Sequence, residues 1–355
     1  MIRRFIKASV AGTLYHTGLL RLGPFSQGRD GQAVILMYHR VVPTSAGDAR
    51  AEKWLRYRSL PGIVVSPAMF ESQLRFLKRK YRIISLEDMA ELLAAREDIP
   101  QKSVVITFDD GWRDNFDYAF PILKKYNVPA TVFLTAEYIG TERLFWPEKM
   151  IALFDTIAEK RTDYPDLSEM TMPDDVAGII EQIKHSSGDA RDEAVGELIE
   201  QVKFIDRNVR DELIARLEAA TGTLPKHRVM LNWEEVSAMQ AGGISFGSHG
   251  LSHEIMTEID EDRLREELAR SKAVIEERLG GPCLTLAYPN GNHDDRVRRL
   301  AEDAGYRCAV AVKSGTVRRD SDRYALNRFN LHENASRGLT GGFSPSQFAF
   351  RLSGI

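Results

Sequence analysis

The sequence contains very little cysteine, no long apolar run and no excess of charge of one sign. Only two of its 355 residues are cysteine, Cys283 and Cys308, and both lie inside apolar runs. This count excludes a disulfide framework and argues against a cysteine-based metal cluster, so we expect two buried, reduced thiols. No stretch approaches the roughly 18 continuous apolar residues that a membrane-spanning helix needs. With 48 Lys and Arg against 51 Asp and Glu, nothing indicates bulk attraction to nucleic acid.

The first 30 residues form a basic, weakly amphipathic segment. Arg3, Arg4 and Lys7 resemble the start of a signal peptide, but Lys7 interrupts the apolar stretch, and we do not expect cleavage. Because apolar residues recur there at helical spacing, we expect a helix docked on the protein itself, with weak contact to a membrane surface as the alternative. The sequence favours a cytoplasmic location, with membrane association second and secretion last. The apolar positions are Ile2, Phe5, Ile6, Val10 and Leu14.

Short apolar runs alternate with helical patterns along residues 31–355. Helices are expected at 67–80 and 261–279, the second ending before Gly280 and Gly281. Strands that alternate with helices predict a parallel α/β sheet, either closed into a barrel or doubly wound. The expected strands span 33–38, 103–108, 130–134, 244–247, 283–288 and 308–312.

One stretch, from about residue 147 to residue 226, breaks this alternation. It contains periodic apolar residues at helical spacing and no convincing strand. We therefore expect a helical insertion within the α/β domain rather than a linker.

Two neighbouring carboxylates follow one of the clearest strands. Asp109 and Asp110 come directly after the run 103–108 and precede Gly111. The ends of parallel strands are where α/β folds place catalytic groups. Two adjacent carboxylates are costly there unless a cation or a shared proton relieves their repulsion. The alternative interpretation is an ordinary Asp-Asp-Gly turn.

Three histidines also stand at or near strand ends. His249 and His253 follow the strand 244–247 and are four residues apart, so both can bind one metal ion. Two histidines and one carboxylate form a known open catalytic metal set, although satisfied loop histidines are the alternative. His39 ends the strand 33–38, where a lone capping histidine is the simpler interpretation. His332, which follows Asn330 and Leu331, is a further candidate.

These strings together resemble the polysaccharide deacetylase family, carbohydrate esterase family 4, over roughly residues 33–330. The resemblance rests on Thr107-Phe108-Asp109-Asp110-Gly111, on His249-x-x-x-His253, on Ala287-Tyr288-Pro289-Asn290 and on the Asn232-Trp233 approach to the histidines. It implies a distorted (β/α)7 TIM-like barrel and metal-dependent removal of acetyl groups from N-acetylated sugars.

The resemblance also implies roles for individual residues. Asp109 would be the catalytic base, and Asp110, His249 and His253 would hold a divalent metal, Zn2+ or another divalent transition metal. Family members usually have Arg-x-Pro-aromatic as a third motif, but this chain has Ala287 in place of the arginine and Asn290 in place of the aromatic residue. The arginine that orients the base is therefore missing from the motif.

The usual late Leu-x-His motif is not matched in full, and His332 is the candidate for its histidine. Both departures resemble the poly-N-acetylglucosamine deacetylase branch, in which the barrel is circularly permuted. There an early Tyr-His, here Tyr38-His39, supplies the general acid, and the third motif reads Ala-Tyr-Pro. On this resemblance His39 is the acid. Tyr288, Pro289 and Asn290 form the substrate and oxyanion loop, with the Asn290 N–H a candidate oxyanion donor.

The expected function is hydrolysis of N-acetyl groups on an N-acetylated exopolysaccharide or oligosaccharide, with no nucleic-acid partner. One alternative is the same fold acting on O-acetyl groups or on a non-sugar amide. Another is a glycan-binding protein that has lost catalysis, which the absent arginine permits. A third is a scaffold that docks on a polysaccharide synthase through the insertion 147–226.

Overall fold

The computed structural model describes residues 10–17, 31–43, 61–224 and 227–353. The chain divides into two compact units, which are described separately below. None of the described helices is long and apolar enough to cross a membrane. The first unit comprises Met1–Thr44, Pro61–Thr141 and Arg228–Ile355, and the second comprises Ser45–Leu60 and Glu142–His227.

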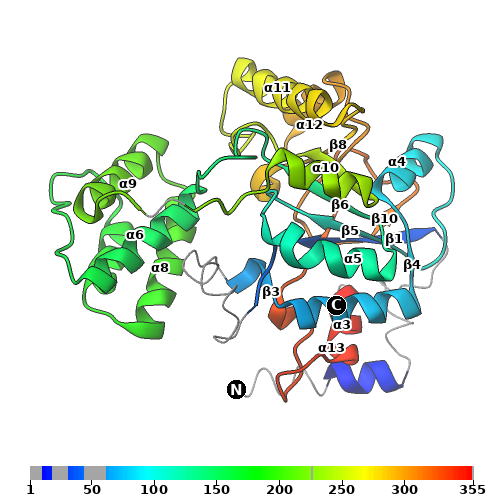
Figure 1. The fold of residues 1–355 in the computed structure, drawn as a ribbon, viewed down its shortest axis with the longest axis horizontal. Coiled ribbons are helices and arrows are strands. Elements are labelled where there is room, and N and C mark those ends of the chain that lie inside the picture. Colours follow the sequence, from blue (N-terminus) through cyan, green and yellow to red (C-terminus); the bar gives the residue numbers. More distant parts are fainter. Residues whose placement is uncertain (1–9, 18–30, 44–60, 225–226, 354–355) are drawn as a thin grey trace. The chain divides into compact units, whose positions relative to one another are not determined.

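The first unit is built on a parallel sheet whose strands follow one another in chain order (Figure 1). Adjacent pairs are parallel throughout this series. The helices α3 (Pro67–Lys80), α5 (Phe120–Tyr126), α10 (Trp233–Ala241), α11 (Glu261–Leu279) and α12 (Asp295–Asp303) connect or cover these strands. The strands are β1 (Gln32–Tyr38), β5 (Ser103–Phe108), β6 (Ala130–Leu134), β7 (Ile244–Ser248), β8 (Thr285–Ala287) and β9 (Cys308–Val310).

A seventh segment, residues 326–330, closes the sheet into a barrel. Its last part is β11 (Phe329–Asn330), which pairs in parallel with β1 on the side away from β5, beside the short antiparallel strand β10 (Val317–Arg318). On the other side Leu326 forms a parallel bridge with Val310, donates its N–H to Ala309 O at 3.0 Å and accepts from the Ala311 N–H at 2.8 Å. The segment is therefore hydrogen-bonded to β9 on one side and to β1 on the other, which joins the first and last strands of the series. The predicted distorted (β/α)7 barrel is confirmed.

The sequence did not reveal this closing segment. Three of the five residues in Leu326-Asn327-Arg328-Phe329-Asn330 are polar, whereas strands such as 33–38 and 103–108 are mainly apolar. Because the polar residues Asn327 and Arg328 are adjacent, the segment shows neither an apolar run nor a regular alternation. The strand expected at 283–288 is also shorter, and only Thr285–Ala287 is paired.

Apolar side chains fill the barrel interior at the end where the strands begin. The helix α4 (Leu86–Ala95) begins with a capping box, in which Ser85 and Asp88 satisfy each other's backbone N–H groups. Its buried residues share one hydrophobic cluster with inward-facing residues of the strands, among them Ile35, Val105 and Val310. Because this cluster occupies one end, polar side chains have space only at the opposite, C-terminal end of the strands.

The thiols and the N-terminal segment can be compared with expectation. Cys283 and Cys308 are buried and free, as predicted, and burial raises the pKa of each thiol to about 12. Of the N-terminal segment, residues 10–16 are helical, Ala11 is buried and Tyr15 packs against the main core. The apolar positions 2, 5 and 6 lie outside the described residues, and contact with a membrane surface stays a prediction.

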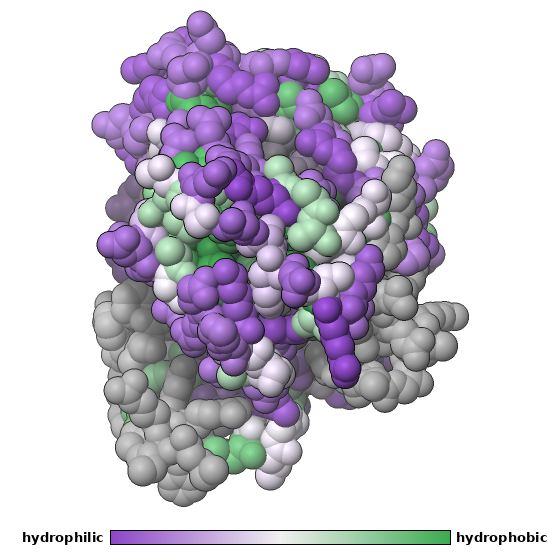
Figure 2. All heavy atoms as spheres, turned by 90° about the vertical axis from the view of Figure 1, so that its left-hand side faces the viewer, coloured by the Kyte–Doolittle hydropathy of each residue, from purple (hydrophilic) through white to green (hydrophobic). Residues whose placement is uncertain are grey.

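The second unit is helical and has its own core. It contains α6 (Trp146–Lys160), α7 (Asp174–Lys184), α8 (Gly188–Val202) and α9 (Arg207–Thr221), and no strand among its described residues. Ile180, Leu198 and Leu217 belong to one buried cluster that is separate from the barrel's clusters. The face in Figure 2 is mainly hydrophilic, with apolar residues in small separate patches. The helices thus bury their apolar stripes against one another.

Gly247 of β7 tests how tightly the barrel is packed. A Cβ at this position would lie 2.4 Å from Thr285 Oγ1 and 2.7 Å from the Phe133 ring. We expect Gly247→Ala to destabilise the protein by about 1–3 kcal/mol through overpacking, measured as a lower urea midpoint. Gly281→Ala is the control, because nothing lies within 4 Å of its Cβ. Equal midpoints for the two variants would show that the barrel relaxes around the added methyl group.

Candidate active site

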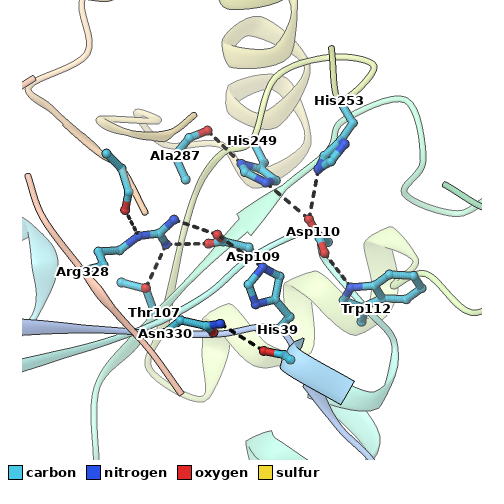
Figure 3. A network of polar contacts seen from close by, with 12 residues as sticks. His39, Thr107, Asp109, Asp110, Trp112, His249, His253, Ala287, Arg328 and Asn330 are labelled. Carbon is cyan, nitrogen blue, oxygen red and sulfur yellow. Dashed lines mark hydrogen bonds and ion pairs between the residues drawn. The ribbon is translucent and has the colours of Figure 1, made fainter. Parts of the chain in front are cut away.

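Polar side chains from separate strands meet at the C-terminal end of the barrel (Figure 3). His39 follows β1, the two aspartates follow β5, and His249 follows β7. Backbone hydrogen bonds continue the sheet to these positions: the Asp109 N–H donates to Tyr38 O at 2.9 Å and the His249 N–H to Leu134 O at 2.8 Å. Parallel strands place their carboxyl ends on one face, so residues 39, 109 and 249 converge despite their separation in sequence.

Asp110, His249 and His253 form one set of potential metal ligands. The Nε2 atoms of both histidines lie 3.3 Å from Asp110 Oδ1. The three potential ligand atoms all lie within 4.8 Å of one another. Such a cluster of donor atoms is favourable only when protons or a cation sit among them. A divalent metal ion fits this donor set.

Neighbouring groups orient the two innermost ligands. His249 Nδ1 lies 2.8 Å from Ala287 O, and because a carbonyl can only accept, Nδ1 carries the hydrogen. In the neutral ring Nε2 then holds the lone pair that faces Asp110. The Trp112 indole N–H donates to Asp110 Oδ2 at 2.8 Å, which leaves Oδ1 directed at the histidines. Burial raises the pKa of Asp110. When the two histidines are protonated instead, their Nε2–H groups donate to Asp110, outweigh the effect of burial and hold its pKa well below the usual value.

The loop that carries the two histidines is held by a buried glutamate. Glu267 of α11 accepts from the backbone N–H groups of Leu251 at 2.7 Å and Ser252 at 3.0 Å, and from Ser252 Oγ at 2.6 Å. Gly250 and His253 both have positive φ, 76° and 66°. The two histidines therefore meet through a tight, strained loop, not on one helical face.

Arg328 corrects the expectation that the base lacks an arginine. Its Nη1 and Nη2 donate to the two carboxylate oxygens of Asp109, each at 2.7 Å, and its Nε donates to Ala311 O at 2.8 Å. The side chain is fully buried. The arginine is absent from the third motif but enters the site from the closing segment of the barrel. Burial raises the pKa of Asp109, but the Arg328 charge, with His249 and the Arg328 hydrogen bonds, brings the pKa below its usual value.

The histidine expected to be the acid lies beside this pair. His39 Nε2 is 3.9 Å from Asp109 Oδ2, and its side chain is 15% exposed. Burial lowers the pKa of His39, although the charges of Asp110 and Asp109 oppose this effect. Asn115 Nδ2 donates to the His39 carbonyl at 2.8 Å. His332 stands just before the short 3-10 helix Glu333–Ala335.

The third-motif loop has a different role for each of its residues. The Tyr288 N–H donates to Val310 O at 3.2 Å and its hydroxyl to Tyr324 O at 2.9 Å, so both hydrogens are turned into the protein. Tyr288 is fully buried. Tyr288 therefore anchors the loop, and its expected substrate role stays a prediction. Pro289 is buried as well, and Asn290 is exposed with φ 56°, so their substrate and oxyanion roles stay predictions.

Sequence comparison agrees with the motifs. The chain matches the family model for polysaccharide deacetylase over residues 96–187 and 204–309, more than half of its length. YxkH of Bacillus subtilis is 21% identical over 313 residues, which are 88% of this chain and 76% of that protein. Poly-β-1,6-N-acetyl-D-glucosamine N-deacetylase of Staphylococcus aureus is 30% identical over 115 residues, 32% of this chain and 39% of that enzyme.

Solved structures share the fold. The deacetylase PplD of Streptococcus pyogenes, solved with acetate, has a TM-score of 0.57 and 19% identity, and the match covers 91% of this chain and 99% of that one. IcaB of Ammonifex degensii has a TM-score of 0.54 and 19% identity, with coverage of 92% and 98%. At this level of identity the likeness establishes the barrel and nothing further.

The pairing of Arg328 with Asp109 leads to a test by protein stability. We expect Arg328→Met to destabilise the protein by about 3–5 kcal/mol, because it leaves a buried carboxylate without its cation. The double variant Arg328→Met/Asp109→Asn removes that charge and should recover part of the loss. Urea unfolding measures both. A double variant no more stable than the single one would contradict the pairing as the source of the effect.

Proposed function

The chain belongs to the polysaccharide deacetylase family, and from this premise we propose that it is a metal-dependent hydrolase that removes N-acetyl groups from an N-acetylated polysaccharide or oligosaccharide. The observation that carries the proposal is the convergence of Asp109 and Asp110 with His39, His249 and His253 at one end of the barrel. Products of the reaction are acetate and a glucosamine unit.

The proposed ligands of the metal are Asp110, His249 and His253. A metal ion bound there supplies Lewis-acid activation of a water molecule and of the acetyl carbonyl. Two imidazoles and one carboxylate suit Zn2+ and also other divalent transition metals, and Zn2+ is our first choice. Trp112 and Ala287 support the site by fixing the orientation of Asp110 and His249.

The proton transfers fall to Asp109 and His39. Asp109 is kept ionised by Arg328, and each of its oxygens retains a lone pair that can accept the proton of the attacking water. His39, in its protonated form, donates from Nε2 to the sugar nitrogen, because an amine is too basic to leave as an anion. The backbone N–H of Asn290 is a proposed additional donor to the oxyanion.

The names of the relatives support a substrate class. The staphylococcal relatives act, by name, on poly-β-1,6-N-acetyl-D-glucosamine, and the aligned region spans 39% of their length. We therefore propose an N-acetylglucosamine polymer as the substrate. A cytoplasmic location, with contact to a membrane surface as the alternative, stays a prediction. So do activity on O-acetyl groups or non-sugar amides, and docking on a synthase.

The main argument for a glycan-binding protein without catalytic activity no longer applies. It depended on a missing arginine, and Arg328 occupies that position beside Asp109. A catalytic function accounts for this buried charge network more directly than glycan binding does, because a neutral glycan has no group that would match two buried carboxylates.

Loss of one ligand tests the metal site. We expect His253→Ala to lose most of its bound metal in elemental analysis, because two ligands remain of three. Asp260→Ala is a control from the same region, since it removes the N-cap of α11 and no candidate ligand. Unchanged stoichiometry in His253→Ala would count against the metal site.

The division of labour between the two aspartates can be tested separately. We expect Asp109→Asn to retain the metal, because Asp110 is intact, and to lose about 10²–10⁴-fold in acetate release, the usual contribution of a general base. Elemental analysis and a turnover assay on one preparation measure both quantities. If the metal is lost instead, the two carboxylates have exchanged roles.

The identity of the acid is tested by comparing two histidines. We expect His39→Ala to retain metal and fold but to reduce turnover by about 10²–10⁴-fold, whereas His332→Ala should change turnover little. Turnover of an N-acetylglucosamine oligomer is the measurement for both. A large loss in His332→Ala together with near-normal His39→Ala would transfer the role to His332.

A further inference from the structure

A buried ion pair lies next to the site and takes no part in the proton transfers. Arg40 immediately follows His39, and its Nε donates to Asp114 Oδ2 at 3.0 Å. Arg40 is 1% exposed and Asp114 is fully buried. Burial raises the pKa of Asp114, while the charge of Arg40 opposes the rise. Burying such a pair seldom stabilises a fold more than apolar packing would, so its position needs another explanation.

Arg40 contacts the tryptophan that orients a proposed metal ligand. The Arg40 guanidinium carbon lies 4.4 Å from the centre of the Trp112 ring, which is fully buried. Trp112 in turn donates its indole N–H to Asp110 Oδ2 at 2.8 Å. A planar guanidinium on an indole face restrains the tilt of that ring. The direction of the Asp110 carboxylate thus depends on a side chain from β2 (Arg40–Val41).

Asp114 and Asn115 bind the backbone on both sides of Arg40. Asp114 Oδ1 accepts from the Val41 N–H at 2.8 Å, and Asn115 Nδ2 donates to the His39 carbonyl at 2.8 Å. The peptide groups on both sides of Arg40 are therefore fixed by residues 114 and 115. One of these peptide groups contains the His39 carbonyl, so the same contacts also fix the backbone from which the side chain of the proposed acid extends.

We propose that Arg40 is a positioning residue that, paired with Asp114 and stacked on Trp112, directs the Asp110 carboxylate toward the metal and couples that direction to the backbone at His39. The inference rests on the proposed function, because it concerns the affinity of the same metal site. Its physical basis is that a carboxylate held by one hydrogen bond at Oδ2 can rotate unless the donor itself is fixed. A misplacement of about 1 Å in such a site can cost about 100-fold in function.

Zn2+ affinity is the direct measurement, by competition with a chromophoric chelator. We expect Arg40→Met, which retains much of the apolar stem but not the guanidinium, to bind Zn2+ about 10- to 100-fold more weakly than the wild type. Arg113→Met is the matched control, because Arg113 directly follows Trp112 in the chain but pairs with Asp117 and Glu235. We expect its affinity to be unchanged. Wild-type affinity in a folded Arg40→Met would overturn the inference.

The Trp112 indole gives a second measurement that does not depend on activity. Its N–H resonance in a 15N-labelled sample can be assigned as the signal missing from Trp112→Phe. We expect this signal to shift on Zn2+ addition in the wild type and in Arg113→Met. In Arg40→Met it should exchange with solvent faster and respond less to Zn2+. Identical indole behaviour in Arg40→Met and Arg113→Met would contradict the proposed restraint.

Arg40→Lys covers the case in which Arg40→Met does not fold. Lysine keeps the charge opposite Asp114 but lacks the planar group that stacks on Trp112. We expect a folded protein with Zn2+ affinity reduced by about 10-fold, and wild-type affinity would overturn the inference. The proposed function fails by a different result: a wild type that binds Zn2+ no better than His253→Ala.

Discussion

The closure of the barrel by residues 326–330 is the constraint on which the site depends. This segment hydrogen-bonds to β9 on one side and to β1 on the other, and it carries Arg328 into the interior. Both of its guanidinium Nη atoms reach Asp109 at 2.7 Å. Without that cation a carboxylate in a low-dielectric interior would be protonated or the fold would lose stability. Closure of the barrel and ionisation of Asp109 are therefore two consequences of one strand.

The two adjacent carboxylates can coexist because the fold gives each its own partners. Asp109 is bound by Arg328, whereas Asp110 receives Trp112 on one oxygen and faces His249 and His253 with the other. Separate partners make the two residues chemically different although they are neighbours in the chain. This asymmetry underlies the proposed division between a proton acceptor and a metal ligand.

The sequence predicted strands correctly where apolar residues form an unbroken run. Apolar runs such as 103–108 and 130–134 became strands at the expected places, and the candidate groups at positions 39, 109, 110, 249 and 253 stand together. The signal failed at 326–330, where three of the five residues are polar and neither an apolar run nor a regular alternation indicates a strand. Nothing in the sequence indicated that the Tyr288 hydroxyl donates to Tyr324 O, because the two residues are distant in the chain.

The sequence by itself determined the strand-and-helix alternation, the family and the choice of candidate site residues, because these depend on neighbouring residues and short spacings. Only the tertiary structure decided which partners these groups have. Arg328 is more than two hundred residues from Asp109, and Arg40 is about seventy from Asp114. Such pairs arise from the register of parallel strands, and register is set by pairing between distant segments, which no local pattern records.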